Sequence, residues 1–334
     1  MANSKPSIAQ QLPETPQVKD ALEFLTSIVG SACQFKASDI HIRSGHQIMM
    51  RLDGRIRQVK GSPQMSDEMI ERLIFPLMSK YYMDKFKQEN QVDLSLSDNS
   101  ANRVRVNMFR QMGQLAVVMR VIENHIPSPD ELGLPQQVRT ISKMRQGLII
   151  FSGSTGSGKS TSMASLINEI NKDRYQHILT IEDPVEYIFT EERCVISQRQ
   201  VGIDVPDFAL AMKAALREDP DVILMGEMRD PESIEIALTA AETGHLVFST
   251  LHAPNSADAI TRMVSSFSGE EQSTIRSKLA HNLRAIVTQR LLPKKEGGGR
   301  TVACEMLTVT PLARELIQQP QRIKEIKDLI KGGD

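Results

Sequence analysis

The sequence predicts a mixed α/β protein built of two unequal parts. Three observations predict this fold class. The second half of the chain alternates short apolar strands with helical stretches, which is typical of a parallel sheet covered by helices. The first half mixes helical periodicity with alternating apolar and polar residues, which indicates a smaller α+β domain. A glycine-rich stretch near the middle follows an apolar strand and precedes a helix, as phosphate-binding loops do.

Composition excludes several classes of protein. The chain has 334 residues, with 40 basic side chains against 41 acidic ones. This balance gives no overall field for a polyanion, so we expect no nucleic acid partner. Cys33, Cys194 and Cys304 are widely spaced, which favours a reducing cytoplasm over a disulfide framework or a zinc site. No apolar run is long enough to span a bilayer, so we expect no integral membrane segment.

The N-terminal residues differ in character from the rest of the chain. Residues 1–16 are polar and rich in proline, and we expect a disordered leader rather than a signal peptide. From Val18 to Ala32 the apolar residues keep helical spacing. This pattern predicts an amphipathic helix that opens the first domain.

Short strands are expected next. Ile40 and Ile42 alternate with polar residues, which indicates a half-buried strand. Two further strands, 48–52 and 55–59, flank Asp53-Gly54, a favoured hairpin turn.

A helix and three more strands complete the first domain. Ser66 can cap a helix that Pro76 should kink or end. Alternating segments then lie at 92–96, 104–108 and 115–122. We therefore expect an N-terminal domain over residues 17–122, with an antiparallel sheet covered by helices.

Residues 123–146 carry several prolines and no strong period, which predicts a linker. The second domain is expected over residues 147–334. Its apolar strands are predicted at 148–151, 177–181, 221–225 and 245–248.

The later part of the second domain has clear signals for where its helices begin and end. Asp230 is suited to cap a helix that ends before Gly244. A long helix is predicted over 271–292, followed by a flexible glycine loop at 294–299. A strand at 301–307 and two short helices close the chain.

The glycine-rich stretch matches the P-loop pattern from Gly153 to Ser160. Its glycines let successive backbone N–H groups face phosphate at a helix N-terminus. Lys159 would reach the β- and γ-phosphates, and the Ser160 hydroxyl would face Mg²⁺. We therefore expect ATP and Mg²⁺ as ligands. The expected nucleotide-binding residues here are Gly153, Ser154, Thr155, Gly156, Ser157, Gly158, Lys159, Ser160 and Thr161.

Polar residues end three other predicted strands. Ligands of open parallel sheets bind outside the carboxyl ends of strands, where Glu182, Glu227 and His252 are expected. Glu182 is our first choice to orient or deprotonate water. Glu227 suits Mg²⁺, directly or through water, and His252 could donate to the γ-phosphate. Taken singly, such carboxylates are often helix caps, and a lone histidine is often structural.

Four motifs in this order resemble a known family. They are similar to the Walker A, aspartate, Walker B and histidine boxes of the bacterial secretion ATPase superfamily, and they span Gly153 to Ser160, Thr180 to Tyr187, Leu216 to Asp230 and Thr243 to His252. Residues 39–43 and 51–55 resemble the start of that superfamily's PAS-like domain. The resemblance implies a RecA-like P-loop ATPase domain behind a PAS-like domain. It further implies a cytoplasmic homo-hexamer, peripheral at the inner membrane, that docks on a platform protein.

Three arginines of the first domain also match the family. Period two places Arg103 and Arg105 on one face of a strand and Val104 and Val106 on the other. With Arg120, they match positions where family members direct arginines towards nucleotide. An anion would relieve the repulsion between the guanidinium groups, although solvated charges on a sheet edge remain the alternative.

The compact layout is similar to the pilus retraction ATPases, of the PilT and PilU types, which power twitching motility. One segment departs from the retraction signature Ala-Ile-Arg-Asn-Leu-Ile: it is Pro311 to Ile317 here. Two alternatives stay open within the family, a pilus assembly or secretion ATPase and an accessory subunit that depends on a paralogous ATPase. A nucleic-acid motor would favour an aromatic, basic channel, whereas this chain has no Trp and four Tyr.

Overall fold

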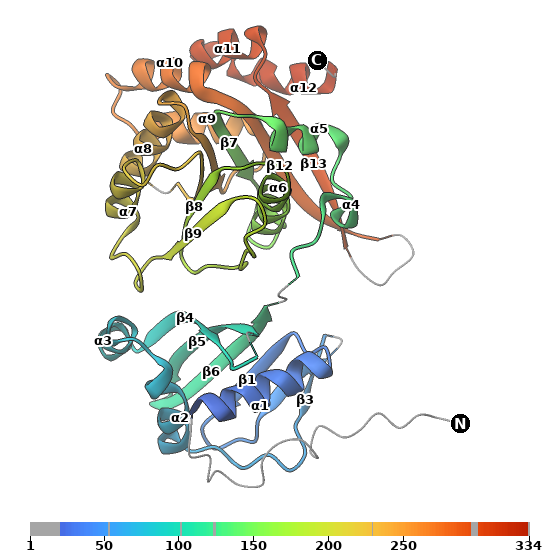
Figure 1. Cartoon of the computed structure of the whole chain (residues 1–334), viewed down its shortest axis with the longest axis vertical. Coiled ribbons are helices and arrows are strands. Elements are labelled where there is room, and N and C mark those ends of the chain that lie inside the picture. Colours follow the sequence, from blue (N-terminus) through green and yellow to red (C-terminus); the bar gives the residue numbers. More distant parts are fainter. Residues whose placement is uncertain are drawn as a thin grey trace. The chain divides into compact units, whose positions relative to one another are not determined.

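The computed structural model describes residues 21–52, 54–100, 102–122, 125–228, 230–294 and 300–332 (Figure 1). The chain divides into two compact units, Met1–His125 and Ile126–Asp334. The expected leader at 1–16 and residues 295–299 of the expected glycine loop lie outside the described residues.

The first unit holds a six-stranded antiparallel sheet with the order β3-β2-β1-β6-β5-β4. Its strands are β1 (Asp39–Arg43), β2 (Met49–Leu52), β3 (Arg55–Gln58), β4 (Gln91–Ser97), β5 (Arg103–Gln111) and β6 (Gln114–Ile122). The helical elements are α1 (Ala21–Gln34), α2 (Asp67–Ile74), η2 (Phe75–Leu77) and α3 (Lys80–Glu89). One apolar cluster packs the helices against a single face of the sheet. The predicted helix-covered antiparallel sheet is therefore confirmed.

Local signals in this unit acted as expected. The Ser66 hydroxyl accepts a hydrogen bond from Met69 N at 3.2 Å and caps α2. Helix α2 ends at Ile74, and Pro76 lies in the following 3-10 turn, where its missing N–H is tolerated. Helix α3 was not predicted. It begins after Ser79 and ends at a left-handed Asn90, with φ of 57°.

The second unit holds a seven-stranded sheet with the order β13-β12-β7-β11-β10-β8-β9. Every neighbouring pair is parallel except β12 with β13. The strands are β7 (Gly147–Ser152), β8 (His177–Glu182), β9 (Val195–Gln200), β10 (Val222–Glu227), β11 (Leu246–Leu251), β12 (Leu283–Pro293) and β13 (Arg300–Thr308). The predicted parallel α/β sheet is confirmed, and the carboxyl ends of β7, β8, β10 and β11 share one edge.

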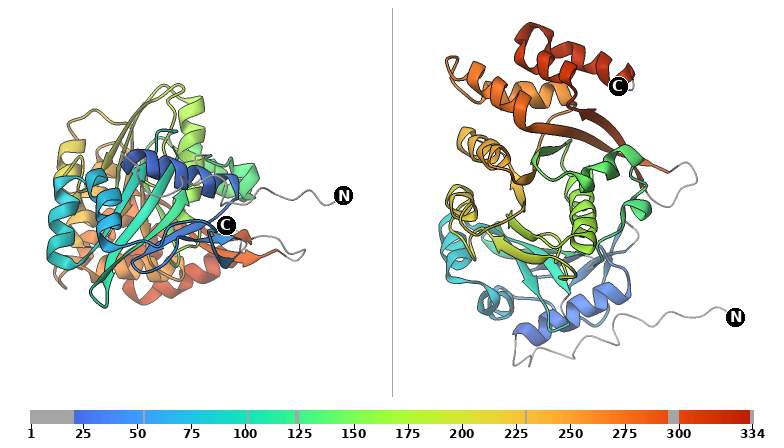
Figure 2. Two further views of the ribbon diagram at one scale, coloured as in Figure 1. Left: turned by 90° about the horizontal axis from the view of Figure 1, so that it is seen from below. Right: turned by 45° about the horizontal axis from the view of Figure 1, so that its top comes forward.

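Helices cover both faces of this sheet. The helical elements are α4 (Pro129–Leu132), α5 (Gln136–Arg139), η3 (Thr140–Lys143), α6 (Lys159–Asp173), α7 (Phe208–Ala215), α8 (Pro231–Glu242), α9 (Ser256–Ser265), α10 (Gln272–Asn282), α11 (Pro311–Gln318), η4 (Pro320–Glu325) and α12 (Ile326–Gly332). One apolar cluster packs α6 against the sheet, and another packs α7 to α12 against the opposite face. Helices α10, α11 and α12, orange to red in Figure 2, lie side by side. Within the described residues, no helix has the length and apolar character required to cross a bilayer.

The helix predicted over 271–292 is wrong in its second half. Helix α10 ends at Asn282, and β12 begins at once. This strand lies between β7 and β13, and the helices on the two sides of the sheet bury both faces of its first half. Leu283 and Ile286 belong to one core cluster, whereas Ala285 and Val287 belong to the other. A continuous apolar run of this kind also fits helical spacing, which explains the error.

The stretch predicted as a linker differs from that expectation over residues 126–146. It carries α4, α5 and η3, and Leu134, Val138 and Ile141 are buried in the cluster that contains α6. Helices of four residues are too short to show a period, and the prolines that suggested a loop instead begin them.

Candidate active site

The P-loop joins the end of β7 to the start of α6. Gly153 has φ of 139°, and a Cβ atom there would lie 2.5 Å from the Gln289 carbonyl oxygen. Only glycine fits this position, because both the backbone conformation and the space exclude a side chain. Gly158 is the left-handed N-cap of α6, with φ of 90°. The loop therefore turns tightly and presents the helix N-terminus at the carboxyl edge of the sheet.

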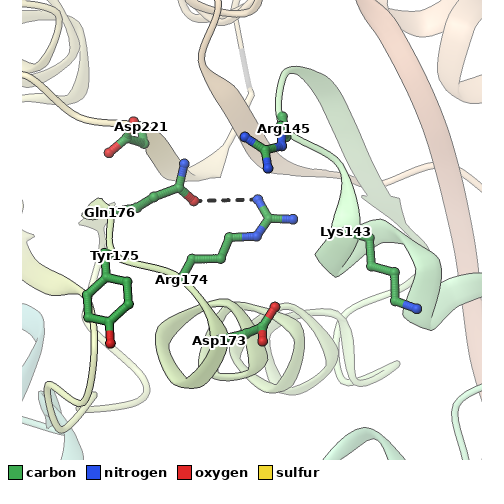
Figure 3. A pocket seen from close by; sticks show the side chains of 7 residues that line it. All are labelled: Lys143, Arg145, Asp173, Arg174, Tyr175, Gln176 and Asp221. Atoms are coloured by element: carbon green, nitrogen blue, oxygen red, sulfur yellow. Dashed lines mark hydrogen bonds between the residues drawn. The ribbon is translucent and has the colours of Figure 1, made fainter.

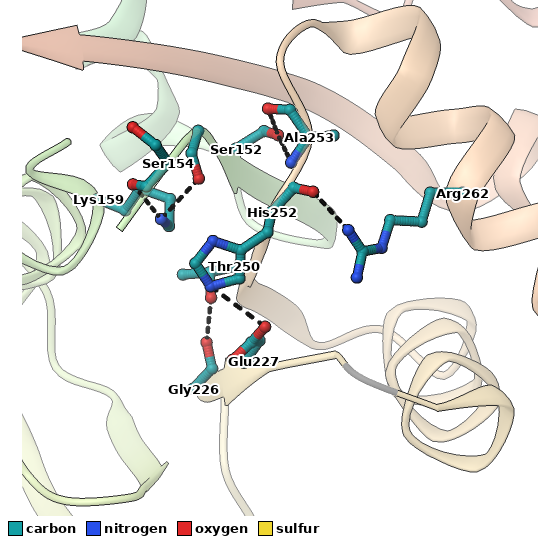
Figure 4. Close-up of polar contacts among 10 residues, drawn as sticks. Ser152, Ser154, Lys159, Gly226, Glu227, Thr250, His252, Ala253 and Arg262 are labelled. Atoms are coloured by element: carbon teal, nitrogen blue, oxygen red, sulfur yellow. Dashed lines mark hydrogen bonds and ion pairs between the residues drawn. The ribbon is translucent and has the colours of Figure 1, made fainter. Parts of the chain in front are cut away.

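Lys159 is held by its own loop. Its Nζ atom donates to Gly153 O at 2.9 Å and to Ser154 O at 3.0 Å (Figure 4). Burial lowers the pKa of this ammonium, while the nearby Glu227 and Glu186 carboxylates act in the opposite direction. The Lys159 side chain thus places its ammonium group beside the loop, where a phosphate site requires a positive charge.

The donor set of the loop fits a polyphosphate. The Ser157 hydroxyl is buried, and within the described residues it has no hydrogen-bond partner. It lies in the same tight loop as the Lys159 ammonium and the first N–H groups of α6. The Ser157 hydroxyl and the first N–H groups of α6 are donors without a matching set of acceptors, and the Lys159 ammonium adds a positive charge beside them. An anion with several oxygens satisfies them.

One buried hydroxyl connects β7, the strand before the P-loop, to the residues that follow β11. Ser152 Oγ donates to Ala253 O at 2.8 Å and accepts from Ala253 N at 3.2 Å. Ser152 is the last residue of β7 and pairs with Leu251 of β11. His252 lies in the chain between Leu251 and Ala253, and these two contacts therefore fix it beside the beginning of the P-loop.

Glu227 ends β10, and His252 directly follows the adjacent strand β11. The His252 Nε2 atom is 3.3 Å from Glu227 Oε1, and Figure 4 shows the ring turned towards that carboxylate. A register shift in β10 before Glu227 and a hydrogen bond of 2.7 Å from Thr250 Oγ1 to Gly226 O shape this end of the strand pair. The Arg262 Nη1 atom donates to His252 O at 2.6 Å. The imidazole and the carboxylate therefore form one polar group.

Glu182 ends β8, the strand beside β10. Burial raises the pKa of this carboxyl to about 7, and the Thr180 hydroxyl and the Glu186 backbone N–H offset the effect only in part. Its Oε2 atom accepts from Glu186 N at 3.4 Å. Among the described residues, Oε1 has no hydrogen-bond partner that meets normal geometry. A carboxyl that titrates near neutral pH can take a proton from water.

The edge of the second unit thus brings together the predicted loop residues with Glu182, Glu227 and His252. The three predicted arginines belong to the first unit. Arg105 of β5 is paired in register with Arg120 of β6. Arg120 Nε donates to Asp39 Oδ1 at 3.0 Å, and Arg105 Nε lies 3.8 Å from Asp93 Oδ1. The approach of these arginines to nucleotide stays a prediction.

The other predictions for this strand concern burial. Val104 and Val106 are fully buried in the core of the first unit, as their alternation predicted. Arg103 is 8% exposed, against the general tendency of arginine to lie at the surface.

Sequence reasoning missed two residues near the site. The Tyr187 hydroxyl lies 2.9 Å from Thr161 Oγ1, so the segment after β8 contacts the first turn of α6. Gln198 of β9 holds the backbone of the same segment. Tyr187 ends the aspartate-box motif and could have been noticed there. Gln198 is one polar residue among several in an edge strand and carries no comparable signal.

A cavity of about 610 Å³ lies away from this site (Figure 3). It is lined by Lys143, Arg145, Asp173, Arg174, Tyr175, Gln176 and Asp221. These residues precede β7, β8 and β10 or lie at the end of α6, so the cavity is at the amino edge of the sheet. Arg174 is tied there by a hydrogen bond of 2.8 Å to Met144 O. The cavity is therefore separate from the P-loop.

The fold and the site define the class of protein. A P-loop after a central strand of a parallel sheet, with two glutamates and a histidine at the ends of neighbouring strands, characterises a P-loop ATPase. Residues 17–332 match the family model described as type II/IV secretion system protein. The chain belongs to this family, and the predicted membership of the secretion ATPase superfamily is confirmed.

Comparison with individual proteins shows which members of this family the chain is similar to. The chain is 38% identical over 309 residues to the type IV pilus retraction ATPase PilT of Pseudomonas aeruginosa, covering 92% of this chain and 89% of that protein. It is also 38% identical over 294 residues to the type IV pilus ATPase PilU of the same organism, covering 88% and 76%. A crystal structure of the pilus retraction motor PilT with bound ADP matches with a TM-score of 0.85 and 42% identity, over 94% of this chain and 90% of that one. The predicted fold class is confirmed by this match.

Proposed function

We propose that this chain is a mechanochemical ATPase that powers retraction of a type IV pilus. The observation that carries the proposal is the assembly of the P-loop, Glu182, Glu227 and His252 at one edge of the sheet. The similarity to PilT over nearly the whole chain supports the choice of machine.

The loop residues bind the triphosphate. Backbone N–H groups of the loop and of the first turn of α6 face its oxygens, and the Ser157 hydroxyl adds a donor. Lys159 leaves the carbonyls of Gly153 and Ser154 and contacts the β- and γ-phosphates. Ser160 and Glu227, the latter directly or through water, would hold Mg²⁺, which neutralises charge on the phosphates when bound.

Glu182 acts on water. It stands at the end of β8, enclosed enough that its pKa is about 7. In the ionised form it accepts a proton from the water that attacks the γ-phosphate, and the bond from that phosphorus to the bridging oxygen breaks. His252, released from Glu227, donates a hydrogen bond to the γ-phosphate and thereby responds to its loss.

The assembly part of the proposal is a cytoplasmic homo-hexamer docked on an inner-membrane platform protein. Nucleotide lies between Lys159 of one subunit and Arg103, Arg105 and Arg120 of another. The register that pairs Arg105 with Arg120 supports this, because it places two guanidinium groups side by side, where a triphosphate would compete with their present partners, Asp93 and Asp39.

A second candidate is an accessory retraction subunit that works with a paralogous ATPase. The observation that favours it is the identity to PilU, which equals the identity to PilT at 38%. Such a subunit binds ATP yet turns it over poorly alone. The same assay separates the two candidates.

The test is steady-state Mg-ATP hydrolysis by the purified chain over a range of protein concentrations. We expect turnover that rises cooperatively with concentration and is lost in Lys159→Ala and Glu182→Gln. Lys143→Ala, at the distant cavity, is the matched lysine control and should keep the wild-type rate. Binding of ATP with negligible turnover at every concentration would favour the accessory subunit. Failure to bind ATP would overturn both candidates.

A further inference from the structure

Within the described part of the chain, the segment after Glu182 pairs with no strand. Its backbone is instead held by two side chains of β9. Gln200 Oε1 accepts from Val185 N at 3.2 Å, and Gln198 Oε1 accepts from Phe189 N at 2.9 Å. Gln198 Nε2 donates to Tyr187 O at 2.8 Å. Both functional atoms of the Gln198 amide are therefore used to fix one irregular segment.

The parallel register places Gln198 beside the proposed base. Thr180 pairs with Gln198, and Glu182 pairs with Gln200. Because side chains alternate along a strand, Gln198 lies on the face of the sheet that carries Thr180 and Glu182. Burial raises the pKa of Glu182 most and the Glu186 carboxylate adds to this effect, whereas the Thr180 hydroxyl, the Glu186 N–H and, least of all, the Gln198 side chain lower it. Gln198 thus bonds the backbone segment after Glu182 and lies on the same face of the sheet as that carboxyl.

The held segment reaches the P-loop helix. Tyr187, whose carbonyl accepts from Gln198, brings its hydroxyl within 2.9 Å of Thr161 Oγ1. Thr161 adjoins Ser160, the proposed magnesium ligand. A continuous series of hydrogen bonds therefore runs from β9 through residues 185–189 to the first turn of α6.

Resting on the proposed ATPase function, we propose that Gln198 is a positioning residue for ATP hydrolysis. It holds Tyr187 and the segment that follows Glu182 at fixed places relative to the N-terminus of α6. Gln198 does not touch the nucleotide. Its amide holds the adjoining segment in place and favours the ionised form of Glu182 on the same face of the sheet, so its loss shifts the protonation of Glu182 and leaves the phosphate donors of the loop intact.

The experiment measures kcat and KM for Mg-ATP from pH 6 to pH 9 with the full chain. Gln198→Leu removes both hydrogen bonds. Gln198→Glu keeps the acceptor for Phe189 N but removes the donor and adds a charge beside Glu182. We expect the acid limb of kcat to move up by about half a unit to one unit in both variants, and further in the Glu variant. The rate at pH 7 then falls about two- to fivefold and recovers towards pH 9, while KM changes less than about twofold.

The matched control is Ser197→Ala. Ser197 lies on the other face of the same strand, where its hydroxyl is 3.0 Å from His177 Nε2. We expect it to keep the wild-type pH profile. If Gln198→Leu fails to fold, Gln198→Glu carries the test, because it preserves shape and one hydrogen bond.

Two results would overturn the proposal. An equal loss of rate at every pH would mean that Gln198 only supports the fold, and an unchanged profile would mean that it has no role. Measuring Glu182→Gln in the same series distinguishes a failure of the proposal for Gln198 from a failure of the proposed ATPase function. If that variant hydrolyses ATP at the wild-type rate, the assignment of the base is wrong, and the role of Gln198 falls with it.

Discussion

Glu227 and His252 meet across the carboxyl ends of β10 and β11, with His252 Nε2 3.3 Å from Glu227 Oε1. A ligand that takes the Nε2 atom of His252 must therefore displace Glu227 Oε1 from this contact. The imidazole can bond either to the Glu227 carboxylate or to a phosphate. The carboxylate can bond either to the imidazole or to a metal ion on that phosphate. We therefore expect the γ-phosphate, when bound as proposed, to change this contact within the protein.

We expect His252→Ala to lower kcat for ATP hydrolysis by about ten- to a hundredfold, because a hydrogen bond to charge that develops in the transition state is lost. KM should change by less than about threefold, since the P-loop is untouched. Steady-state kinetics measure both. His245→Ala is the matched control, because His245 contacts Ala240 O away from the site. A wild-type kcat in His252→Ala would reject a role for the imidazole in turnover.

The raised pKa of Glu182 also predicts how stability depends on pH. The folded-state value of about 7 exceeds the ordinary value of 4.5, so the native state holds this proton more tightly than the unfolded chain. Its favourable contribution is complete below pH 4.5 and is lost as pH rises through 7. Glu182→Gln cannot ionise. We therefore expect it to gain about 1 to 3 kcal/mol in free energy of unfolding, relative to wild type, between pH 5 and pH 8.

Urea unfolding at the two pH values measures this difference. Glu169→Gln, on α6, controls for the loss of one carboxylate elsewhere in the same unit. An equal difference between wild type and Glu182→Gln at both pH values would contradict the burial of an ionisable base at this position.

Gly153 offers a test of the loop backbone. In Gly153→Ala, the new Cβ would lie 2.5 Å from Gln289 O and 2.8 Å from Ser157 Oγ. We expect loss of nucleotide binding and a destabilisation of about 1 to 3 kcal/mol. Gly269→Ala is the control, since a Cβ there meets nothing within 4 Å. Calorimetric ADP binding and chemical unfolding report the two effects, and normal ADP affinity in Gly153→Ala would exclude this tight loop geometry.

Shared active sites between subunits can be tested by mixing two inactive variants. We expect Lys159→Ala and Arg105→Glu each to abolish hydrolysis. In a statistical mixed ring, about a quarter of the interfaces join an intact Lys159 to an intact Arg105, so up to about a quarter of the activity should return. Arg72→Glu, on exposed α2, should remain active alone. If mixing restores no hydrolysis although the rings exchange subunits, the arginines do not act on a neighbour's nucleotide.

The sequence was sufficient for those parts of the site that obey a topological rule. Strand ends in a parallel sheet share an edge, so Lys159, Glu182, Glu227 and His252 could be grouped from the sequence alone. The rule about strand ends does not identify Gln198. Its side chain bonds the backbone of another segment, and such a contact leaves no periodic pattern in the sequence. The rule also fails for β12, where two buried faces in the first half remove the alternation that distinguishes strand from helix.

Lys159 already has two oxygen partners, the carbonyls of Gly153 and Ser154. In the proposed function, nucleotide arrival is therefore an exchange of ligands around one ammonium rather than a simple addition. The same carbonyls are then available to the ammonium again as the product departs. For a motor that must empty its site on every cycle, this return favours speed over tight retention of the product.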